Sequence, residues 1–160
     1  MLGSFSVGKT SLVRRYVQSI YEDKYLTTVG VKVDKKILRV GDDEVVMMLW
    51  DIYGEDEFQK LRMSHLRGAN GYLLVADGTR RATLEKALEM NEHVQASPDA
   101  APAVLVVNKV DLAADWEVTQ EMLEELRGRG WVPLESSAKT GEGVEEAFQT
   151  LAGMMLGQKR

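Results

Sequence analysis

The residues best suited to chemistry lie at the start of the chain. Gly3-Ser4-Phe5-Ser6-Val7-Gly8-Lys9-Thr10 fits G-x-x-x-x-G-K-[ST], the pattern of a phosphate-binding loop. Its glycines allow a tight turn, so that successive N–H groups and the start of the next helix can face an anion. In this pattern Lys9 reaches the β- and γ-phosphates, and the Thr10 hydroxyl binds Mg²⁺. The expected phosphate-binding residues are Ser6, Val7, Gly8, Lys9, Thr10 and Ser11.

A phosphate-binding loop normally follows a buried strand, but only Met1 and Leu2 precede Gly3. Two residues span at most ~7 Å, whereas a strand has about five or six residues. We therefore expect that the first strand is largely missing from this chain. Residues 1–160 are expected to form one domain, truncated at its N-terminus.

The composition narrows the class of protein. The chain has 44% hydrophobic residues, enough for a full core, and 28% charged residues of both signs. Its net charge of -5 argues against broad binding to nucleic acid or to anionic membranes. There is no cysteine, and therefore no disulfide, no cysteine metal site and no cysteine to prenylate at the C-terminus. We expect a cytoplasmic protein without an intrinsic lipid anchor.

Hydrophobic periodicity predicts strands that alternate with helices. The expected helices cover residues 11–20, 84–95, 117–127 and 143–156, with a possible short helix around 57–66. The expected strands cover residues 29–40, 45–50, 72–76, 104–107 and 131–134. The first two strands are joined by a turn at 41–43 and should form an antiparallel hairpin. The alternation that follows implies a mostly parallel sheet covered on both faces.

Four further motifs follow the loop in a fixed order: Thr28-Val29-Gly30, Asp51-Ile52-Tyr53-Gly54, Asn108-Lys109-Val110-Asp111 and Ser136-Ser137-Ala138-Lys139. With the phosphate-binding loop, this order resembles the small GTPases of the Ras superfamily. The resemblance implies the Ras-like fold of P-loop NTPases, an α/β three-layer sandwich. Its six-stranded sheet is mostly parallel with one antiparallel edge strand.

Some details resemble the Rab branch of that superfamily. Trp50 stands directly before Asp51, Phe58 follows soon after, and residues 67–71 read Arg-Gly-Ala-Asn-Gly. In Rab proteins the matching tryptophan helps to form an effector surface; the alternative for Trp50 is ordinary sheet packing. The resemblance implies that effectors, exchange factors and GTPase-activating proteins bind at residues 21–30 and 51–67.

The resemblance also assigns the base-binding residues. Guanine presents its N1–H and N2–H₂ donors on one edge, and a carboxylate can accept from both, whereas adenine lacks this pair. By resemblance Asp111 is that carboxylate, so that GTP and GDP are selected over ATP. Asn108 would contact the base and tie the loops together, and the stem of Lys109 would lie over the ring. The third loop, Ser137, Ala138 and Lys139, would meet the guanine carbonyl through the Ala138 N–H. Taken alone, residues 108–111 also fit a polar turn after a strand.

Further roles follow from the resemblance around the γ-phosphate. Thr28 would close over Mg²⁺, Asp51 would hold the ion through water, and the Gly54 N–H would touch the γ-phosphate. Tyr21 would lie beside the base. The alternatives are an ordinary strand threonine for Thr28 and a packing residue for Tyr21. Hydrolysis would remove the γ-phosphate contacts and release both loops.

Two departures from the family concern catalysis, for which Lys9, Gly54 and Glu55 are the expected residues. Glu55 replaces the glutamine that orients the attacking water. An ionised carboxylate accepts a hydrogen bond from water but cannot donate to the transition state. We expect intrinsic hydrolysis at or below ~10⁻⁴ s⁻¹, or a partner that supplies the missing group while Glu55 faces solvent. Phe5 and Tyr53 add bulk where small residues are usual; the Phe5 ring could crowd a partner's arginine or fold away over the switch loops.

The sequence thus predicts a GTP/GDP switch that hydrolyses GTP slowly with Mg²⁺. One alternative is a switch module that barely hydrolyses and relies on partners. Another is a P-loop kinase, which Asp111 and residues 137–139 argue against. Arg80 and Arg81 are expected to form a solvated helix start with no catalytic role.

Overall fold

The computed structural model describes residues 1–19, 31–52, 66, 68–96 and 101–157. The elements are α1 (Lys9–Gln18), β1 (Val31–Val40), β2 (Asp43–Ile52), β3 (Tyr72–Asp77), α2 (Arg81–Gln95), β4 (Ala103–Asn108), the 3₁₀ helix η3 (Val110–Asp115), α3 (Gln120–Gly128), β5 (Leu134–Ser136) and α4 (Val144–Gly157). None of the helices in these ranges has the length and apolar character needed to cross a membrane.

The strands form one antiparallel pair and one parallel group. β1 pairs with β2 along its whole length, from Val31 opposite Ile52 to Val40 opposite Asp43. β4 lies between β3 and β5 and runs parallel to both. Leu2 forms a parallel bridge with Leu74 of β3, and the Met1 ammonium donates to the Trp50 carbonyl of β2. The first two residues therefore lie between the antiparallel pair and the parallel group.

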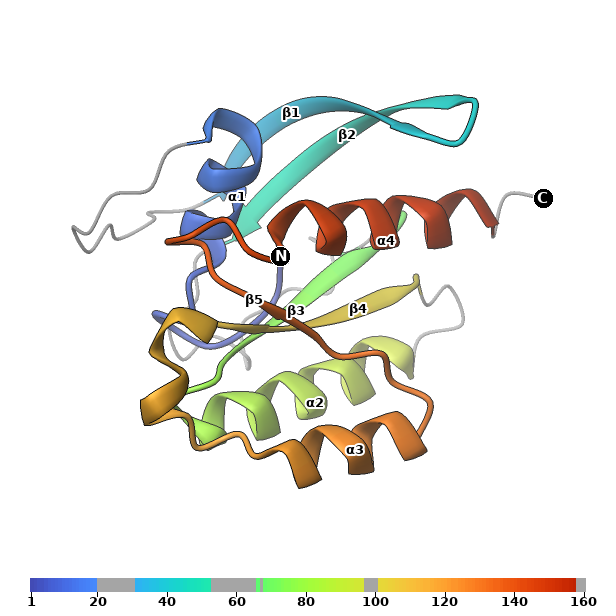
Figure 1. Cartoon of the computed structure of the whole chain (residues 1–160). Helices are drawn as coiled ribbons and strands as arrows, with labels where there is room; N and C mark the ends of the chain where they lie inside the picture. The colour runs from blue at the N-terminus through green and yellow to red at the C-terminus, as the bar shows by residue number, and fades with distance from the viewer. Residues whose placement is uncertain (20–30, 53–65, 67, 97–100, 158–160) are drawn as a thin grey trace.

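Helices cover the parallel strands on both faces (Figure 1). Alternate residues of β3 point to opposite sides: Leu73 and Val75 join one apolar cluster, whereas Leu74 and Ala76 join the other. α1 and α4 complete the first cluster with Leu12, Val13, Tyr16, Ala147, Phe148 and Leu151. α2 and α3 complete the second with Leu84, Ala87, Met90, Leu123 and Leu126. The result is the expected three-layer arrangement, and both faces of the parallel strands are apolar because both are buried.

The predicted hairpin and the four predicted main helices are confirmed, with shifted ends. Among the described residues there are five strands, and the place of the expected sixth is taken by the Leu2 bridge. The bounds of the strand predicted at 131–134 are wrong, because β5 begins only at Leu134. The Trp131 N–H is engaged by the Leu126 carbonyl of α3, and Pro133 has no N–H to donate. The possible helix at 57–66 lies almost entirely outside the described residues.

Candidate nucleotide-binding site

The phosphate-binding loop connects the Leu2 bridge to α1 and contains three residues with positive φ. A Cβ atom on Gly3 would lie 2.2 Å from the Val75 carbonyl oxygen, and one on Gly8 would lie 2.2 Å from the Asn108 Nδ2 atom. Glycine is therefore required at both positions by close packing as well as by backbone conformation. Ser6 has φ 58, a left-handed conformation that costs a non-glycine residue of order 1–3 kcal/mol. The loop is thus held in one shape by its surroundings.

The Lys9 side chain folds back over this loop. Its Nζ atom donates to the Gly3 and Ser4 carbonyl oxygens, each at 2.8 Å, and the residue is only 7% exposed. Burial lowers the pKa of the Lys9 ammonium to about 8, and the nearby charge of Asp51 opposes that shift. The loop therefore presents a poorly solvated cation, which a phosphate would stabilise.

Thr10 and Asp51 meet at the start of α1 and the end of β2. The Thr10 Oγ1 atom donates to Asp51 Oδ2 at 2.5 Å, and Asp51 is buried. A hydroxyl and a carboxylate are hard oxygen ligands of the kind that Mg²⁺ takes together with substrate phosphates. The two expected metal ligands that the structure describes therefore fit the ion, and they lie beside the phosphate loop.

Asn108 joins the phosphate loop to the loop that follows β5. Its Nδ2 atom donates to the Val7 carbonyl oxygen at 2.9 Å. Its Oδ1 atom accepts from the Ala138 N–H at 3.1 Å and from the Ser136 hydroxyl at 3.3 Å. The structure thus places Asn108 as expected for a residue that ties the loops together.

Lys109 and Asp111 lie at the same edge of the sheet, just after β4. The Lys109 backbone is left-handed, with φ 76, and its Nζ atom lies 2.6 Å from Asp77 Oδ2. The Asp111 Oδ1 atom accepts from the Ser137 hydroxyl at 2.5 Å. The motifs at residues 108–111 and 136–139 are therefore in direct contact through Asp111 and Ser137.

Two contacts to this region come from residues that the sequence did not single out. The Arg15 Nε atom of α1 donates to the Ala138 carbonyl oxygen at 2.7 Å, and the same guanidinium bonds the Lys139 carbonyl. The Trp116 Nε1–H donates to the Lys109 carbonyl oxygen at 2.9 Å. Periodicity puts Arg15 on a polar helix face, and no sequence signal indicates that it caps a distant loop.

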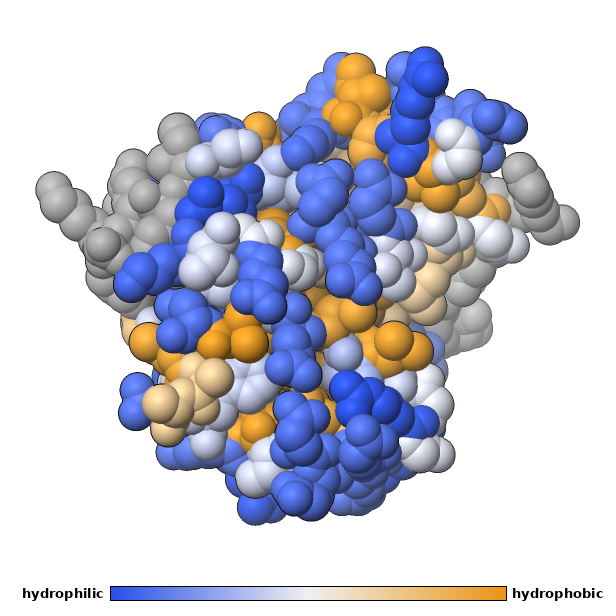
Figure 2. All heavy atoms as spheres, viewed as in Figure 1, coloured by the Kyte–Doolittle hydropathy of each residue, from blue (hydrophilic) through white to orange (hydrophobic). Residues whose placement is uncertain are grey.

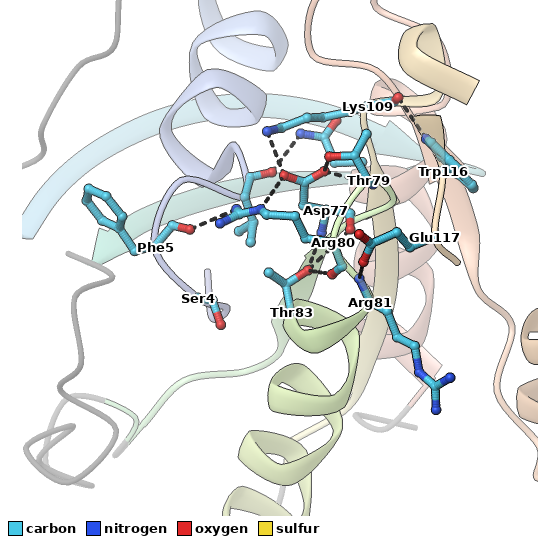
Figure 3. Close-up of polar contacts among 12 residues, drawn as sticks. Ser4, Phe5, Asp77, Thr79, Arg80, Arg81, Thr83, Lys109, Trp116 and Glu117 are labelled. Carbon is cyan, nitrogen blue, oxygen red and sulfur yellow. Dashed lines mark hydrogen bonds and ion pairs between the residues drawn. The ribbon is translucent and has the colours of Figure 1, made fainter. Parts of the chain in front are cut away.

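Arg80 stands at the start of α2 as expected and its side chain is 43% exposed, but the expectation missed its contacts with Asp77 and the phosphate loop. Arg80 precedes α2, and its Nε atom donates to Asp77 Oδ2 at 2.9 Å. Its second nitrogen, an Nη atom, donates to the Phe5 carbonyl oxygen of the phosphate loop at 3.1 Å. The buried Asp77 carboxylate also accepts from the Thr79 N–H and hydroxyl (Figure 3). A polar cluster thus adjoins the phosphate loop.

The remaining predicted residues divide into two groups. Ser11 lies in the first turn of α1, Lys139 is exposed after β5, and the Phe5 side chain is 37% exposed and points away from the Asp77 cluster (Figure 3). The structure therefore brings together the described members of all three base and phosphate motifs. The predicted residues outside the described ranges are Tyr21, Thr28, Tyr53, Gly54, Glu55 and Phe58.

Comparison with known proteins agrees with this geometry. Residues 1–156 match the model of the Ras family. The chain is 37% identical to Ras-related protein Rab-17 of Mus musculus over 98% of this chain and 74% of that protein. It is 33% identical to Ras-related protein Rab-30 of Homo sapiens, over 100% of this chain and 80% of that protein. Ras-related protein Rab-7a of Dictyostelium discoideum is 36% identical over 95% of this chain and 78% of that protein. The chain belongs to the Ras family of small GTPases, in its Rab branch, and is a GTP-binding switch protein.

Proposed function

We propose that the described loops bind a guanine nucleotide with Mg²⁺ at the edge of the sheet where β3, β4 and β5 end. Lys9 and the backbone of residues 6–11 bind the phosphates, and Thr10 and Asp51 hold the ion. Asp111 accepts from the guanine N1–H and N2–H₂ groups, while Asn108, Lys109 and residues 137–139 frame the base. When bound, Mg²⁺ neutralises charge on the β- and γ-phosphates.

The observation that carries this proposal is the convergence of segments far apart in the sequence. The Asn108 carboxamide bonds the phosphate loop on one side and the Ala138 N–H on the other. The phosphate loop and the base loops are thereby held at a fixed separation. A ligand with an anionic end and a planar donor edge, such as a guanine nucleotide, would engage both.

Exchange of the base tests the role of Asp111. Xanthine carries a carbonyl where guanine carries its 2-amino group, so an amide N–H₂ is the better partner for xanthine than a carboxylate is. We expect Asp111→Asn to weaken GDP binding by about 1–3 kcal/mol, by analogy with bidentate base contacts, and to strengthen XDP binding. Competition of both nucleotides against a fluorescent GDP measures this.

The matched control is Asp115→Asn, which removes the same charge from an exposed residue of η3. It should leave the ratio of GDP to XDP affinity unchanged. Equal effects of the two substitutions would contradict the assignment of Asp111 to the base.

Hydrolysis is proposed to be slow and to be limited by Glu55. A water molecule attacks the γ-phosphorus in line, the bond to the β–γ bridging oxygen breaks, and GDP and inorganic phosphate are formed. Lys9 offsets the charge that develops on the phosphate oxygens. Glu55 brings a negative charge to the position of the usual glutamine, and an ionised carboxylate has no proton to donate there. The switch would therefore remain loaded with GTP until a partner supplies the missing donor.

Single-turnover hydrolysis of preloaded GTP tests this proposal. Wild type is expected to turn over at or below ~10⁻⁴ s⁻¹, and Glu55→Gln to be faster. If Glu55→Gln loses activity instead, Glu55 itself positions the water and the proposal is wrong. Phosphoryl transfer to an acceptor other than water would favour a P-loop kinase.

Partners are proposed to bind residues 21–30 and 51–67, as the resemblance implies, and also the outer face of the β1–β2 hairpin. On this face Trp50 is 54% exposed and lies opposite Val33, which is 41% exposed, so Trp50 is not packed into the sheet. Ile37 and Val46 continue the stripe, and apolar surface is visible over the hairpin at the top of Figure 2. Exposed apolar stripes of this kind are typical of interaction sites. Trp50→Ala should abolish binding of an effector to the GTP-loaded protein and leave nucleotide affinity unchanged.

A further inference from the structure

Arg80 is the feature of the site that neither the motifs nor the proposed nucleotide contacts explain. Its guanidinium spans two groups: Nε donates to Asp77 Oδ2 at 2.9 Å, and an Nη atom donates to the Phe5 carbonyl oxygen at 3.1 Å. Phe5 lies 75 residues away in the sequence, inside the phosphate loop. The planar fork of arginine donates along fixed directions, so that Asp77 aims the second nitrogen at the loop.

The Phe5 carbonyl belongs to the same planar peptide unit as the Ser6 N–H. In a trans peptide the C=O and N–H groups point in opposite directions, so a carbonyl held by Arg80 also fixes where the Ser6 N–H points. A cation on the oxygen polarises the peptide and makes that N–H a stronger donor. Ser6 is a non-glycine residue at φ 58, a conformation that persists only when its surroundings enforce it.

We propose that Arg80 is a positioning residue that holds the Phe5–Ser6 peptide with its N–H directed into the anion site, and so slows nucleotide release. This inference rests on the proposed nucleotide site. It assigns to the start of α2 a role in retention of the phosphates, distinct from the contacts of Lys9.

The Asp77 carboxylate also connects Arg80 to Lys109, a residue of the proposed base site. Asp77 Oδ2 accepts from Arg80 Nε at 2.9 Å and from Lys109 Nζ at 2.6 Å, and Figure 3 shows both cations converging on it. Asp77 is fully buried, so water does not compete with these two cations for its carboxylate. The phosphate loop and Lys109 are therefore linked through one anion, and loosening Arg80 also removes one of the two cations that fix Asp77.

The test measures release of a fluorescent GDP analogue from wild type, Arg80→Gln and Arg80→Lys. Loss of one half-exposed charged hydrogen bond predicts release about fivefold faster for Arg80→Gln. Arg80→Lys keeps the charge but lacks the fork, and should fall between the two. Arg81→Gln is the matched control: it removes the same charge from the next residue, whose Nε atom pairs with Glu85 on the exposed face of α2.

A second readout separates positioning from general stability. In the GDP-loaded protein, Arg80→Gln should move the Ser6 amide proton resonance upfield, because its peptide is less polarised, while Arg81→Gln leaves it in place. Thermal unfolding of each GDP-loaded variant identifies any variant that fails to fold. If Arg80→Gln fails to fold, Arg80→Lys is compared with wild type in its place.

Unchanged release together with an unchanged Ser6 resonance would overturn this inference alone. Equal acceleration by Arg80→Gln and Arg81→Gln would also overturn it, since surface charge would then explain the effect. If wild type binds no GDP analogue, the proposed nucleotide site fails, and this inference fails with it.

Discussion

Asn108→Ala is expected to destabilise the protein by about 3 kcal/mol. Asn108 is 2% exposed and provides the buried partners of the Val7 carbonyl and the Ala138 N–H. Alanine leaves both backbone groups buried without that partner, at about 1–3 kcal/mol each. A water molecule that enters the space of the lost carboxamide would recover part of the cost. The expected value therefore lies in the lower half of the summed range.

Urea unfolding of wild type and variant measures this difference. Bound nucleotide adds RT ln(1 + [L]/Kd) to the stability, so unfolding is followed at several GDP concentrations and extrapolated to zero. Asn91→Ala is the matched control, because within the described part of the chain the Asn91 side chain makes one hydrogen bond, accepting from the Tyr72 hydroxyl at 2.9 Å. Tyr72 keeps a second bond from Gln95, so the control should cost about 0.5–1.5 kcal/mol.

The reasoning would be refuted if Asn108→Ala cost no more than Asn91→Ala at zero nucleotide. It would also be refuted if the loss appeared only in the GDP-dependent part of the stability. In that case Asn108 would act on the ligand alone and would not hold the loops together in the free protein.

Three further outcomes follow from the structure. Gly8→Ala should abolish GDP binding, since its Cβ would meet the Asn108 amide. Gly130 shares the positive φ, but no atom of the described residues lies within 4 Å of the position of its Cβ. Gly130→Ala should therefore cost only the ~1–2 kcal/mol of left-handed strain, as unfolding measurements would show. Burial raises the pKa of the Asp77 carboxyl, but its hydrogen bonds outweigh this and hold the pKa below the ordinary 3.8. The stability that Asp77 contributes is then complete above about pH 5 and lost as the pH falls below 3.8, so the difference in unfolding free energy from Asp77→Asn should shrink across that window. Tyr16→Phe should leave stability unchanged or raise it by up to ~1 kcal/mol in thermal unfolding, because the Tyr16 hydroxyl is buried with no hydrogen-bond partner among the described residues.

The parts of the site that the sequence predicts are those whose chemistry is local. Gly8 and Lys9 belong to one motif of eight consecutive residues, because a single loop must turn tightly and carry a cation. Such a local pattern can be recognised in the sequence. Asp51 and Asn108 each follow a predicted buried strand, but their roles came from the resemblance to the Ras-superfamily GTPases. Hydrophobic patterning and the turn at 41–43 likewise predicted the β1–β2 hairpin, and the structure confirms its antiparallel pairing.

The parts that escaped prediction depend on contacts across the fold. Arg15 reaches a carbonyl 123 residues away, and Arg80 reaches one 75 residues away. Both occupy polar positions at helices, where a long cationic side chain is normally solvated. Only the packed structure shows that loop carbonyls lie within hydrogen-bond distance of both side chains. The start of β5 was missed for a similar reason, since the Trp131 N–H is already bonded to the end of α3.

These distant contacts connect the phosphate loop to the loops proposed to bind the base. Asn108 links the phosphate loop to the loop after β5, and Asp77 links the same phosphate loop, through Arg80, to Lys109. Two buried groups, one neutral and one anionic, therefore connect the phosphate loop to the loops that follow β4 and β5. A nucleotide that contacts both ends does not have to order them, which favours tight binding. For the same reason, an exchange factor that displaces the phosphate loop would loosen the base loops as well, so that both ends of the nucleotide would be released together.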